Sequence, residues 1–275
     1  MPSRPRPAGC PPDPVFRGIS QSHMARVKSA KTPRRHGKRV KTLKPKRRAL
    51  WWRVLRWPVR AILAILVFCV LWVGLYRFIA LPGGIYMATE AWERGGIRQD
   101  WRPIEEISPR LVRSVMAAED ARFCDHHGFD FEAIREAMRL NEQGKRTYGA
   151  STITQQTAKN VFLWHQRSWV RKGLEAGFTV LIELLWPKRR IIEVYLNTAE
   201  FAPGVFGAEA GAQHHFGRPA LALTLTQASR LAAVLPSPRK RSASQPSGYV
   251  KRRSRAIAGG AQTLEAEGRD KCAFD

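Results

Sequence analysis

The most apolar stretch of the chain lies near its N-terminal end, at about residues 58–81. Residues 61–76 contain no charged side chain, and Arg60 and Arg77 flank them where long side chains can reach the membrane interface. About 20 apolar residues are enough to cross the hydrocarbon layer as a helix. The pattern therefore predicts one transmembrane anchor. A cleaved signal peptide is the alternative, but the run begins far from the N-terminus and no small-residue cleavage site follows it.

After the anchor, apolar positions recur at helical spacing. The next strong helix is predicted to begin at Pro109, with Ser108 as its N-cap. Its apolar positions repeat every three to four residues, and Glu119 follows Val112 by seven residues and Val115 by four. A carboxylate is therefore predicted on the buried side of this helix.

Helical patterns continue along the rest of the chain. Asp130 is placed to cap a second helix whose apolar face includes Phe131 and Met138. Thr152 with Gln155 fits a capping box, so a further helix is predicted to open there. Later helices are predicted at about residues 168–186, 189–197 and 224–236.

Strand signals are few, so the expected fold class is mostly α, with one helical domain and no internal repeats. The C-terminal tail is expected to be frayed or loosely helical. The sequence thus divides into a basic tail, the anchor, a connector, the helical domain and the C-terminal tail, at residues 1–57, 58–81, 82–108, 109–258 and 259–275.

Basic residues crowd the N-terminal side of the anchor. The first 50 residues hold fifteen Lys or Arg and one acid, Asp13, and the next acid is Glu90. This composition predicts a disordered tail, which the positive-inside rule places in the cytoplasm. Topology and anionic lipid therefore explain much of the net charge of +25, and no nucleic-acid partner is predicted. The part after the anchor is still net basic, which suits an anionic, membrane-borne substrate.

The cysteines and histidines give no metal-binding pattern. His126 and His127 are interpreted as structural, because no third ligand is spaced for zinc. Cys124 and Cys272 could form a disulfide in an oxidising compartment, although spacing alone leaves the pairing open. The four cysteines lie far apart in the sequence, at Cys10, Cys69, Cys124 and Cys272.

Polar residues on three predicted helices can meet in one site. Ser151, Gln155 and Lys159 are spaced i, i+4, i+8 and share one face, while Glu119 ends its own helix. A third group combines cations with a carboxylate, at Arg167, Arg171, Lys172 and Glu175. Taken alone, these residues also fit ordinary salt bridges and solvated faces, so their spacing supports only an anion-binding helical domain.

Specific strings favour an enzyme. The sequences EDARFCDHHGFD at 119–130 and GASTITQQTAKN at 149–160 resemble the first two motifs of the family 51 peptidoglycan glycosyltransferases. The resemblance continues in order along the chain, at residues 167–175, 191–197, 204–207 with 215–217, and 231–238. Ala150 is a small departure, because the family usually has Gly there.

The resemblance implies a lysozyme-like helical fold that acts on lipid II. The implied reaction joins the 4-hydroxyl of one disaccharide to the anomeric carbon of a growing lipid-linked chain, which gives a β-1,4 glycan with inversion and releases undecaprenyl pyrophosphate. Such an enzyme is expected in the bacterial inner membrane, with a cytoplasmic N-terminus and a periplasmic catalytic domain. Its expected partners are lipid II, the growing glycan chain, the membrane and proteins of cell-wall synthesis or division.

The resemblance also assigns roles to residues. Glu119 is the expected base, because an alcohol attacks poorly until a carboxylate of raised pKa removes its proton. Glu175 is the second carboxylate, which orients the cations or helps to hold a divalent ion. No cofactor is expected to be required, although Mg²⁺ or Mn²⁺ can accompany the pyrophosphate. The leaving pyrophosphate is expected to meet Ser151, Gln155, Lys159, Arg167, Arg171 and Lys172.

Glu193 and Asn197 lie one turn apart on a predicted helix and are interpreted as structural. Two other functions fit parts of the pattern. A lysozyme-like hydrolase would cut glycan, but it has no need for a row of cations. A membrane-anchored scaffold would bind polyanions in a salt-sensitive way, and this binding would survive the loss of Glu119. The string Ser237 to Lys240 matches S-x-x-K, yet too few residues follow for a transpeptidase and no Lys-Thr-Gly occurs.

Overall fold

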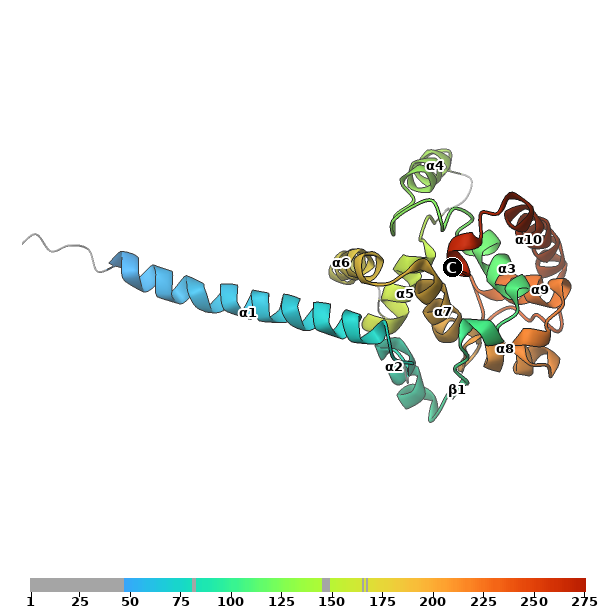
Figure 1. Ribbon diagram of the computed structural model, residues 1–275, viewed down its shortest axis with the longest axis horizontal. Helices are drawn as coiled ribbons and strands as arrows, with labels where there is room; N and C mark the ends of the chain where they lie inside the picture. Colours follow the sequence, from blue (N-terminus) through green and yellow to red (C-terminus); the bar gives the residue numbers. More distant parts are fainter. Residues whose placement is uncertain (1–46, 81–82, 145–148, 165, 167) are drawn as a thin grey trace, which may run out of the picture. The chain divides into compact units, whose positions relative to one another are not determined.

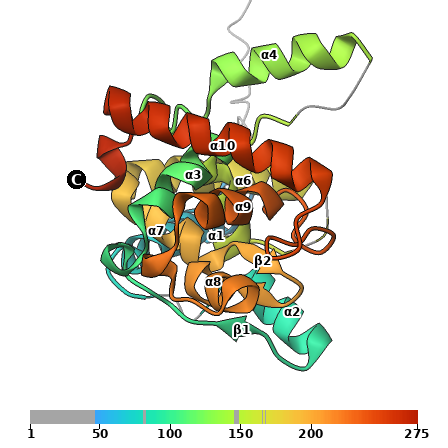
Figure 2. The same cartoon turned by 90° about the vertical axis from the view of Figure 1, so that its right-hand side faces the viewer.

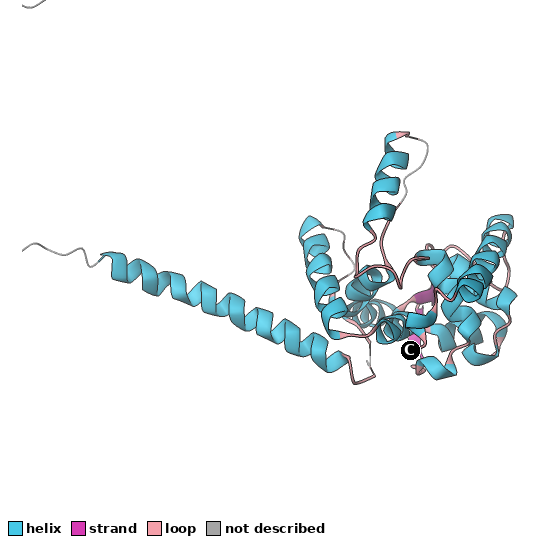
Figure 3. Cartoon of the chain, turned by 45° about the horizontal axis from the view of Figure 1, so that its top comes forward, coloured by secondary structure: helices cyan, strands magenta, loops and turns pink. Residues whose placement is uncertain are grey.

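Helices make up most of the described chain, as Figures 1 and 3 show. The computed structural model describes residues 47–80, 83–144, 149–164, 166 and 168–275. The α-helices are α1 (Arg47–Tyr76), α2 (Ile85–Arg94), α3 (Pro109–Glu119), α4 (Phe131–Glu142), α5 (Ile153–Phe162), α6 (Trp169–Leu185), α7 (Lys188–Thr198), α8 (Ala208–Phe216), α9 (Leu225–Val234) and α10 (Gly248–Glu267). The short 3-10 helices and strands are η1 (Ile104–Glu106), η2 (Ala220–Ala222), η3 (Lys271–Ala273), β1 (Arg98–Gln99), β2 (Glu200–Ala202) and β3 (Val205–Phe206). The predicted mostly α fold class is confirmed.

Helix α1 contains the predicted membrane anchor. Its segment Leu55–Tyr76 is long and apolar enough to cross a membrane by length and composition, and only 6% of its most apolar window is buried. Such exposure argues against a core helix, whose apolar side chains would be covered. The helix ends at Tyr76, short of residue 81. The disorder predicted for residues 1–57 lies outside the described residues as far as residue 46, whereas residues 47–57 belong to α1.

The last turns of α1 join the core of the unit formed by residues 53–275. Trp72 packs edge-on against Phe162, with ring centroids 5.1 Å apart, and against Phe178 at 6.3 Å. The indole nitrogen of Trp186 donates a hydrogen bond of 2.8 Å to the carbonyl oxygen of Val73. Anchor and helical domain therefore share apolar packing.

Two helix groups and a small sheet build the rest of this unit. Helices α3, α9 and α10 pack on one another, while α5 packs against α6 and α7 (Figure 2). In the sheet, β3 lies between β1, to which it is parallel, and β2, to which it is antiparallel. The ends of α3 and α5, from the two different groups, carry the polar residues described below.

Most predicted helix starts are confirmed. Helix α3 begins at Pro109, and the side chains of Thr152 and Thr224 each close a capping box, at the starts of α5 and α9. Ser108 is the N-cap residue of α3, but its hydroxyl makes no cap bond and donates instead to the carbonyl oxygen of Leu223. The side chains of Thr152 and Thr224 thus accept the hydrogen bonds predicted at the starts of α5 and α9, whereas Ser108 does not do so for α3.

Helix α4 differs from its prediction in what covers it. Asp130 caps the helix by accepting hydrogen bonds from the amides of Glu132 and Ala133, as predicted. The predicted apolar face is open, however: Phe131 is 67% exposed, Met138 is 59% exposed, and no residue of α4 is buried. Figures 2 and 3 show α4 projecting from the other helices of the unit. Periodicity predicted the helix but not its surroundings.

The C-terminal tail was expected to be frayed or loosely helical, and the structure shows a packed helix there, so fraying is wrong. Helix α10 continues past Gly259 to Glu267, and it buries Leu264. Cys272 forms a disulfide with Cys124, with Cα atoms 5.7 Å apart. A buried face and a covalent link therefore offset the weak helix propensity of the glycines in this helix.

Candidate active site

Glu119 is the last residue of α3, and its side chain is 12% exposed. Its Oε2 atom accepts a hydrogen bond of 2.9 Å from the Nε2 atom of Gln156 on α5. Its Oε1 atom is buried and has no hydrogen-bond partner among the described residues. The Nη2 atom of Arg253 on α10 lies 3.9 Å from Oε1. The carboxylate is thus held on one side by an amide and faced on the other by a cation.

The surroundings of Glu119 increase the affinity of its carboxylate for a proton. Burial raises the pKa of Glu119, because a charged carboxylate loses its hydration there. The hydrogen bond from Gln156 and the charges of Arg253 and Lys159 act in the opposite direction. A carboxylate of raised pKa takes a proton from a substrate more readily than an exposed one.

Tyr195 fixes the orientation of Gln156. Its hydroxyl donates a hydrogen bond of 3.2 Å to the Oε1 atom of Gln156, which directs the amide Nε2 atom to Glu119. Burial raises the pKa of Tyr195 well above its usual value, so the phenol stays neutral and keeps its proton for this bond. Residues from α3, α5 and α7 thus form one hydrogen-bonded chain.

Lys159 lies one turn beyond Gln156 on α5 and is half-buried. Burial lowers the pKa of this lysine, and the nearby cations Arg171 and Lys172 lower it further. The carboxylates of Glu175 and Glu119 oppose them. Lys159 therefore lies within electrostatic range of both the candidate base and the cationic cluster on α6.

On α6, Glu175 organises two cations. This buried carboxylate accepts a hydrogen bond of 3.2 Å from the Nη1 atom of Arg171 and also contacts the ammonium of Lys172. The Nε atom of Arg171 is buried and has no hydrogen-bond partner among the described residues. The group therefore carries a net positive charge and an unused donor, which suits an anion.

Two cavities adjoin these residues. One of about 570 Å³ is lined by Ser151, Gln156 and Lys159, and along its length by Trp164 and Arg239. The other, of about 330 Å³, is lined by Glu119 and the loop of residues 149–152. Ser151 lines both cavities. The carboxylate of Glu119 therefore lines one cavity and Lys159 lines the other.

Comparison with known proteins agrees with this geometry. The family model described as Transglycosylase matches residues 88–262. The chain belongs to the transglycosylase family. The matched region contains α3, α5 and α6, which carry Glu119, Lys159 and Glu175.

Three curated relatives, each named biosynthetic peptidoglycan transglycosylase, are similar over most of the chain. The relative from Jannaschia sp. (strain CCS1) is 55% identical over 217 residues, which cover 79% of this chain and 89% of that protein. The relative from Bdellovibrio bacteriovorus is 52% identical over 216 residues, or 76% and 86% of the two chains. The relative from Xanthomonas campestris pv. campestris (strain B100) is 49% identical over 235 residues, or 83% and 95%.

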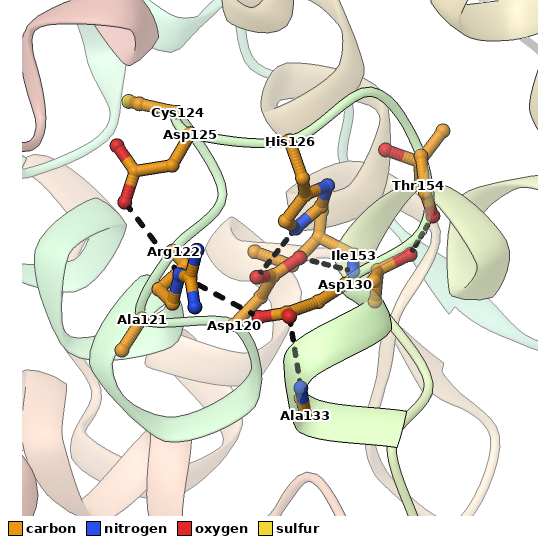
Figure 4. Close-up of polar contacts among 12 residues, drawn as sticks. Asp120, Ala121, Arg122, Cys124, Asp125, His126, Asp130, Ala133, Ile153 and Thr154 are labelled. Atoms are coloured by element: carbon orange, nitrogen blue, oxygen red, sulfur yellow. Dashed lines mark hydrogen bonds and ion pairs between the residues drawn. The ribbon is translucent and has the colours of Figure 1, made fainter. Parts of the chain in front are cut away.

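Asp120, the neighbour of Glu119 in this transglycosylase domain, holds the site together (Figure 4). Its Oδ2 atom accepts a hydrogen bond of 3.0 Å from the backbone amide of Ile153, and its Oδ1 atom lies 2.9 Å from the Nε2 atom of His126. Both carboxylate oxygens are thereby occupied. Asp120 therefore ties the end of α3 to the start of α5 and contacts His126, whose structural interpretation stays a prediction.

The predicted shared face of Ser151, Gln155 and Lys159 is only partly present. Helix α5 begins at Ile153, so Ser151 lies before the helix and is exposed. Gln155 is buried, and its side chain accepts a hydrogen bond of 3.0 Å from the backbone amide of Thr152. Gln155 therefore closes the capping box and does not line either cavity. The prediction failed for Gln155 because its side chain turns back to the Thr152 amide, as the capping box requires, and for Ser151 because it precedes the helix.

The remaining predicted residues divide into two groups. Lys159, Arg171, Lys172 and Glu175 come together as predicted, while Arg167 lies outside the described residues. Sequence reasoning missed the roles of Gln156, Tyr195 and Arg253. Gln156 could have been found from the sequence, because it lies one turn before Lys159 on the predicted helix. Arg253 could not, because no local signal connects it to Glu119.

Glu193 and Asn197 on α7 hold the connector, which agrees with their structural interpretation. The Oε2 atom of Glu193 accepts a hydrogen bond of 3.0 Å from the backbone amide of Ile104. The amide nitrogen of Asn197 donates one of 2.8 Å to the carbonyl oxygen of Arg102. Both side chains are thus engaged by the backbone and are not directed to a ligand.

The described residues do not fit a resident metal ion. Both oxygens of Glu175 contact cations, and both oxygens of Asp120 are engaged. In the described ranges, no group of three or more His, Cys, Asp or Glu side chains is placed to hold a metal. A divalent ion that arrives with a pyrophosphate remains a prediction.

Proposed function

We propose that this chain is a peptidoglycan glycosyltransferase that polymerises lipid II in bacterial cell-wall synthesis. One observation carries the proposal: the largely buried carboxylate of Glu119 accepts a hydrogen bond from Gln156, which lies one turn before the cation Lys159 on α5. The names of the curated relatives, biosynthetic peptidoglycan transglycosylase, support the same activity. A base beside a cluster of cations suits a reaction in which an alcohol attacks and a pyrophosphate leaves.

In the proposed reaction, Glu119 accepts the proton of the 4-hydroxyl of one disaccharide. The oxygen then forms a bond to the anomeric carbon of the growing chain. The bond from that carbon to the pyrophosphate oxygen breaks, and undecaprenyl pyrophosphate leaves with the electron pair. Attack and departure occur on opposite faces in this single displacement, so the configuration inverts.

The cations have a different task in this proposal. A pyrophosphate departs as an anion, so it needs stabilisation by positive charge more than it needs an acid. Lys159, Arg171 and Lys172 would supply that charge, with Glu175 fixing the last two. Arg167 belongs to this group by its resemblance to the family motif. The buried Arg171 Nε atom, unpaired in the described chain, is a ready donor for a phosphate oxygen.

The proposed location is the inner membrane, with the N-terminus in the cytoplasm and the domain in the periplasm. The apolar segment Leu55–Tyr76 and the basic residues before it support this orientation. A substrate whose lipid lies in the outer leaflet of that membrane would then reach the domain beside the anchor. The growing glycan chain is the second proposed partner, and proteins of cell-wall synthesis or division remain a prediction.

The deciding experiment gives lipid II to the detergent-solubilised full chain and measures glycan polymer and released undecaprenyl pyrophosphate. Wild type should form both products, and Glu119→Gln should bind lipid II but form neither, because only the proton acceptor is lost. Glu142→Gln is the matched control, since that carboxylate is exposed on α4 and outside the site; it should retain activity.

Two outcomes would overturn the proposal. A lysozyme-like hydrolase would shorten preformed glycan and make no polymer from lipid II. A polyanion-binding scaffold would bind in a salt-sensitive way, and Glu119→Gln would bind like wild type without either protein turning over substrate.

A further inference from the structure

Arg253 on α10 is a charged neighbour of Glu119 to which neither the motifs nor the proposed reaction gives a role. It lies in the cationic run Lys251 to Arg255, at the edge of the helix face that buries Ser254 and Ile257. Arg252 in the same run is exposed, whereas Arg253 is half-buried. Its position therefore directs one cation of the run into the protein while its neighbours face solvent.

Within the described residues, the hydrogen bond and the ion pair of Arg253 both lie at the end of α3. Its Nη2 atom donates a hydrogen bond of 3.3 Å to the carbonyl oxygen of Ala118. The same atom lies 3.9 Å from the Oε1 atom of Glu119, which is its only ion pair within the described residues. Its Nε atom and the Oε1 atom of Glu119 are both buried without hydrogen-bond partners in that part of the chain.

We propose that Arg253 is a positioning residue for the base: it anchors the last turn of α3 through Ala118 and keeps Glu119 ionised between turnovers. The inference rests on the proposed function, in which Glu119 must begin each cycle without a proton. Arg253 itself contacts no substrate in this scheme. It acts through the backbone carbonyl before Glu119 and through its charge.

The distance of 3.9 Å has a chemical consequence. A direct hydrogen bond from a guanidinium stabilises a carboxylate strongly and makes it a poor base. A nearby charge without that bond opposes the effect of burial and still leaves the oxygen basic. The other groups that bear on Glu119 come from its own neighbour and two other helices: Asp120, Gln156, Lys159 and Tyr195. Arg253 adds the cation from the α10 side.

The test compares pH profiles of kcat/KM for lipid II polymerisation in wild type, Arg253→Gln, Arg253→Lys and Arg252→Gln. Loss of the charge should move the acid limb of Arg253→Gln to higher pH by about one unit, with an approximately tenfold loss of kcat/KM below that limb. Arg253→Lys keeps the charge and should stay close to the wild-type profile. Arg252→Gln removes an exposed charge from the same helix and should change neither limb.

A packing role alone gives a different result. If Arg253→Gln lowers kcat/KM equally at every pH and lowers the melting temperature without moving the acid limb, the positioning role is overturned. Arg253→Met keeps the aliphatic stem and repeats the comparison if the Gln variant does not fold.

A substrate-free measurement separates this inference from the proposed function. In ¹³C-labelled protein, the carboxyl resonance of Glu119, assigned by its loss in Glu119→Gln, should titrate at higher pH in Arg253→Gln than in wild type. An unchanged titration contradicts the role of Arg253 whatever the activity. Absence of polymerisation by wild type contradicts the proposed function and leaves the titration valid.

Discussion

At the scale of one residue, the buried carboxylate of Glu119 lowers the stability of the folded chain. Its Oε1 atom is buried with no hydrogen-bond partner among the described residues, and burial raises its pKa. An ionised carboxylate in this place costs free energy that a neutral side chain would not cost. Gln156 and Arg253 offset part of this cost, because both favour the charged form.

Glu119→Gln is therefore expected to raise the stability of the folded chain at neutral pH. A raised pKa in the folded state means that the stability contributed by this group is present below its unfolded pKa and is lost as the pH rises through the folded value. The variant should exceed wild type by on the order of 1 kcal/mol at pH 7, and the gain should vanish below about pH 4. Denaturant unfolding between pH 4 and 8 measures it, with Glu142→Gln as the unchanged control. A variant less stable than wild type at pH 7 would contradict the account.

Lys159 sets an expectation for the alkaline side of the pH profile. Burial lowers its pKa, so its charge is lost at a lower pH than that of an ordinary lysine. Lys159→Arg should move the basic limb of kcat to higher pH, because a guanidinium keeps its charge.

Lys159→Ala tests the same residue by deletion. It should reduce kcat by about 10²–10³-fold, because charge on the departing pyrophosphate loses a stabilising partner. Lys251→Ala, an exposed lysine on α10, serves as the control. Unchanged turnover of lipid II by Lys159→Ala would remove this residue from the site.

At the scale of elements, the site is built where two helices end and begin. Asp120 connects the end of α3 to the first amide of α5, so Glu119 and Gln156 are held at a fixed separation. The loop after Asp120 is linked to the C-terminal segment by the disulfide between Cys124 and Cys272. Helix α10 packs on α3 and brings Arg253 with it. The C-terminal segment is thus part of what holds the base.

Replacement of both Cys124 and Cys272 by Ser is expected to lower the free energy of unfolding by about 2–4 kcal/mol, because the link spans 148 residues of the unfolded chain. Thermal unfolding followed by circular dichroism measures it, and wild type in reductant should resemble the variant. Cys69→Ser is the control, since Cys69 is free and lies in α1. Equal stability of wild type and the double variant would contradict the structural role of the disulfide.

At the scale of the whole molecule, the anchor does more than attach the domain. Trp72 of α1 packs against Phe162 and Phe178, and the carbonyl of Val73 accepts the Trp186 hydrogen bond. The end of α1 thereby completes an aromatic cluster on α5 and α6. Removal of the anchor would expose that cluster to solvent.

Trp72→Ala tests this packing. Loss of the half-buried indole should lower the free energy of unfolding by about 2 kcal/mol, which is less than for a fully buried aromatic side chain. The full chain in detergent should show a lower melting temperature for Trp72→Ala than for Leu71→Ala, whose side chain is 67% exposed. Equal melting temperatures would show that anchor and domain are energetically independent.

Local patterns in the sequence determined where six helices begin, α3 to α7 and α9, but did not predict α2 or α8 and left the end of α10 as a frayed or loosely helical tail. Apolar spacing predicted α3, α6, α7 and α9, and short polar side chains marked the starts of α4 and α5, because these signals act within a few residues. The same spacing placed Glu119 on the buried side of α3. Where the sequence reading failed locally, at Gln155, the side chain turned back to cap the backbone amide of Thr152 and did not face a ligand cavity.

Tertiary structure alone decided which of these elements meet. The pairing of Cys124 with Cys272, the exposed face of α4, and the approach of Arg253 to Glu119 depend on segments that are far apart in the chain or on what covers them. Periodicity and capping carry no information at that range, because they describe one helix at a time. Glu119 could therefore be predicted as the base from sequence, but the cation that faces its buried oxygen appeared only when α10 was packed on α3.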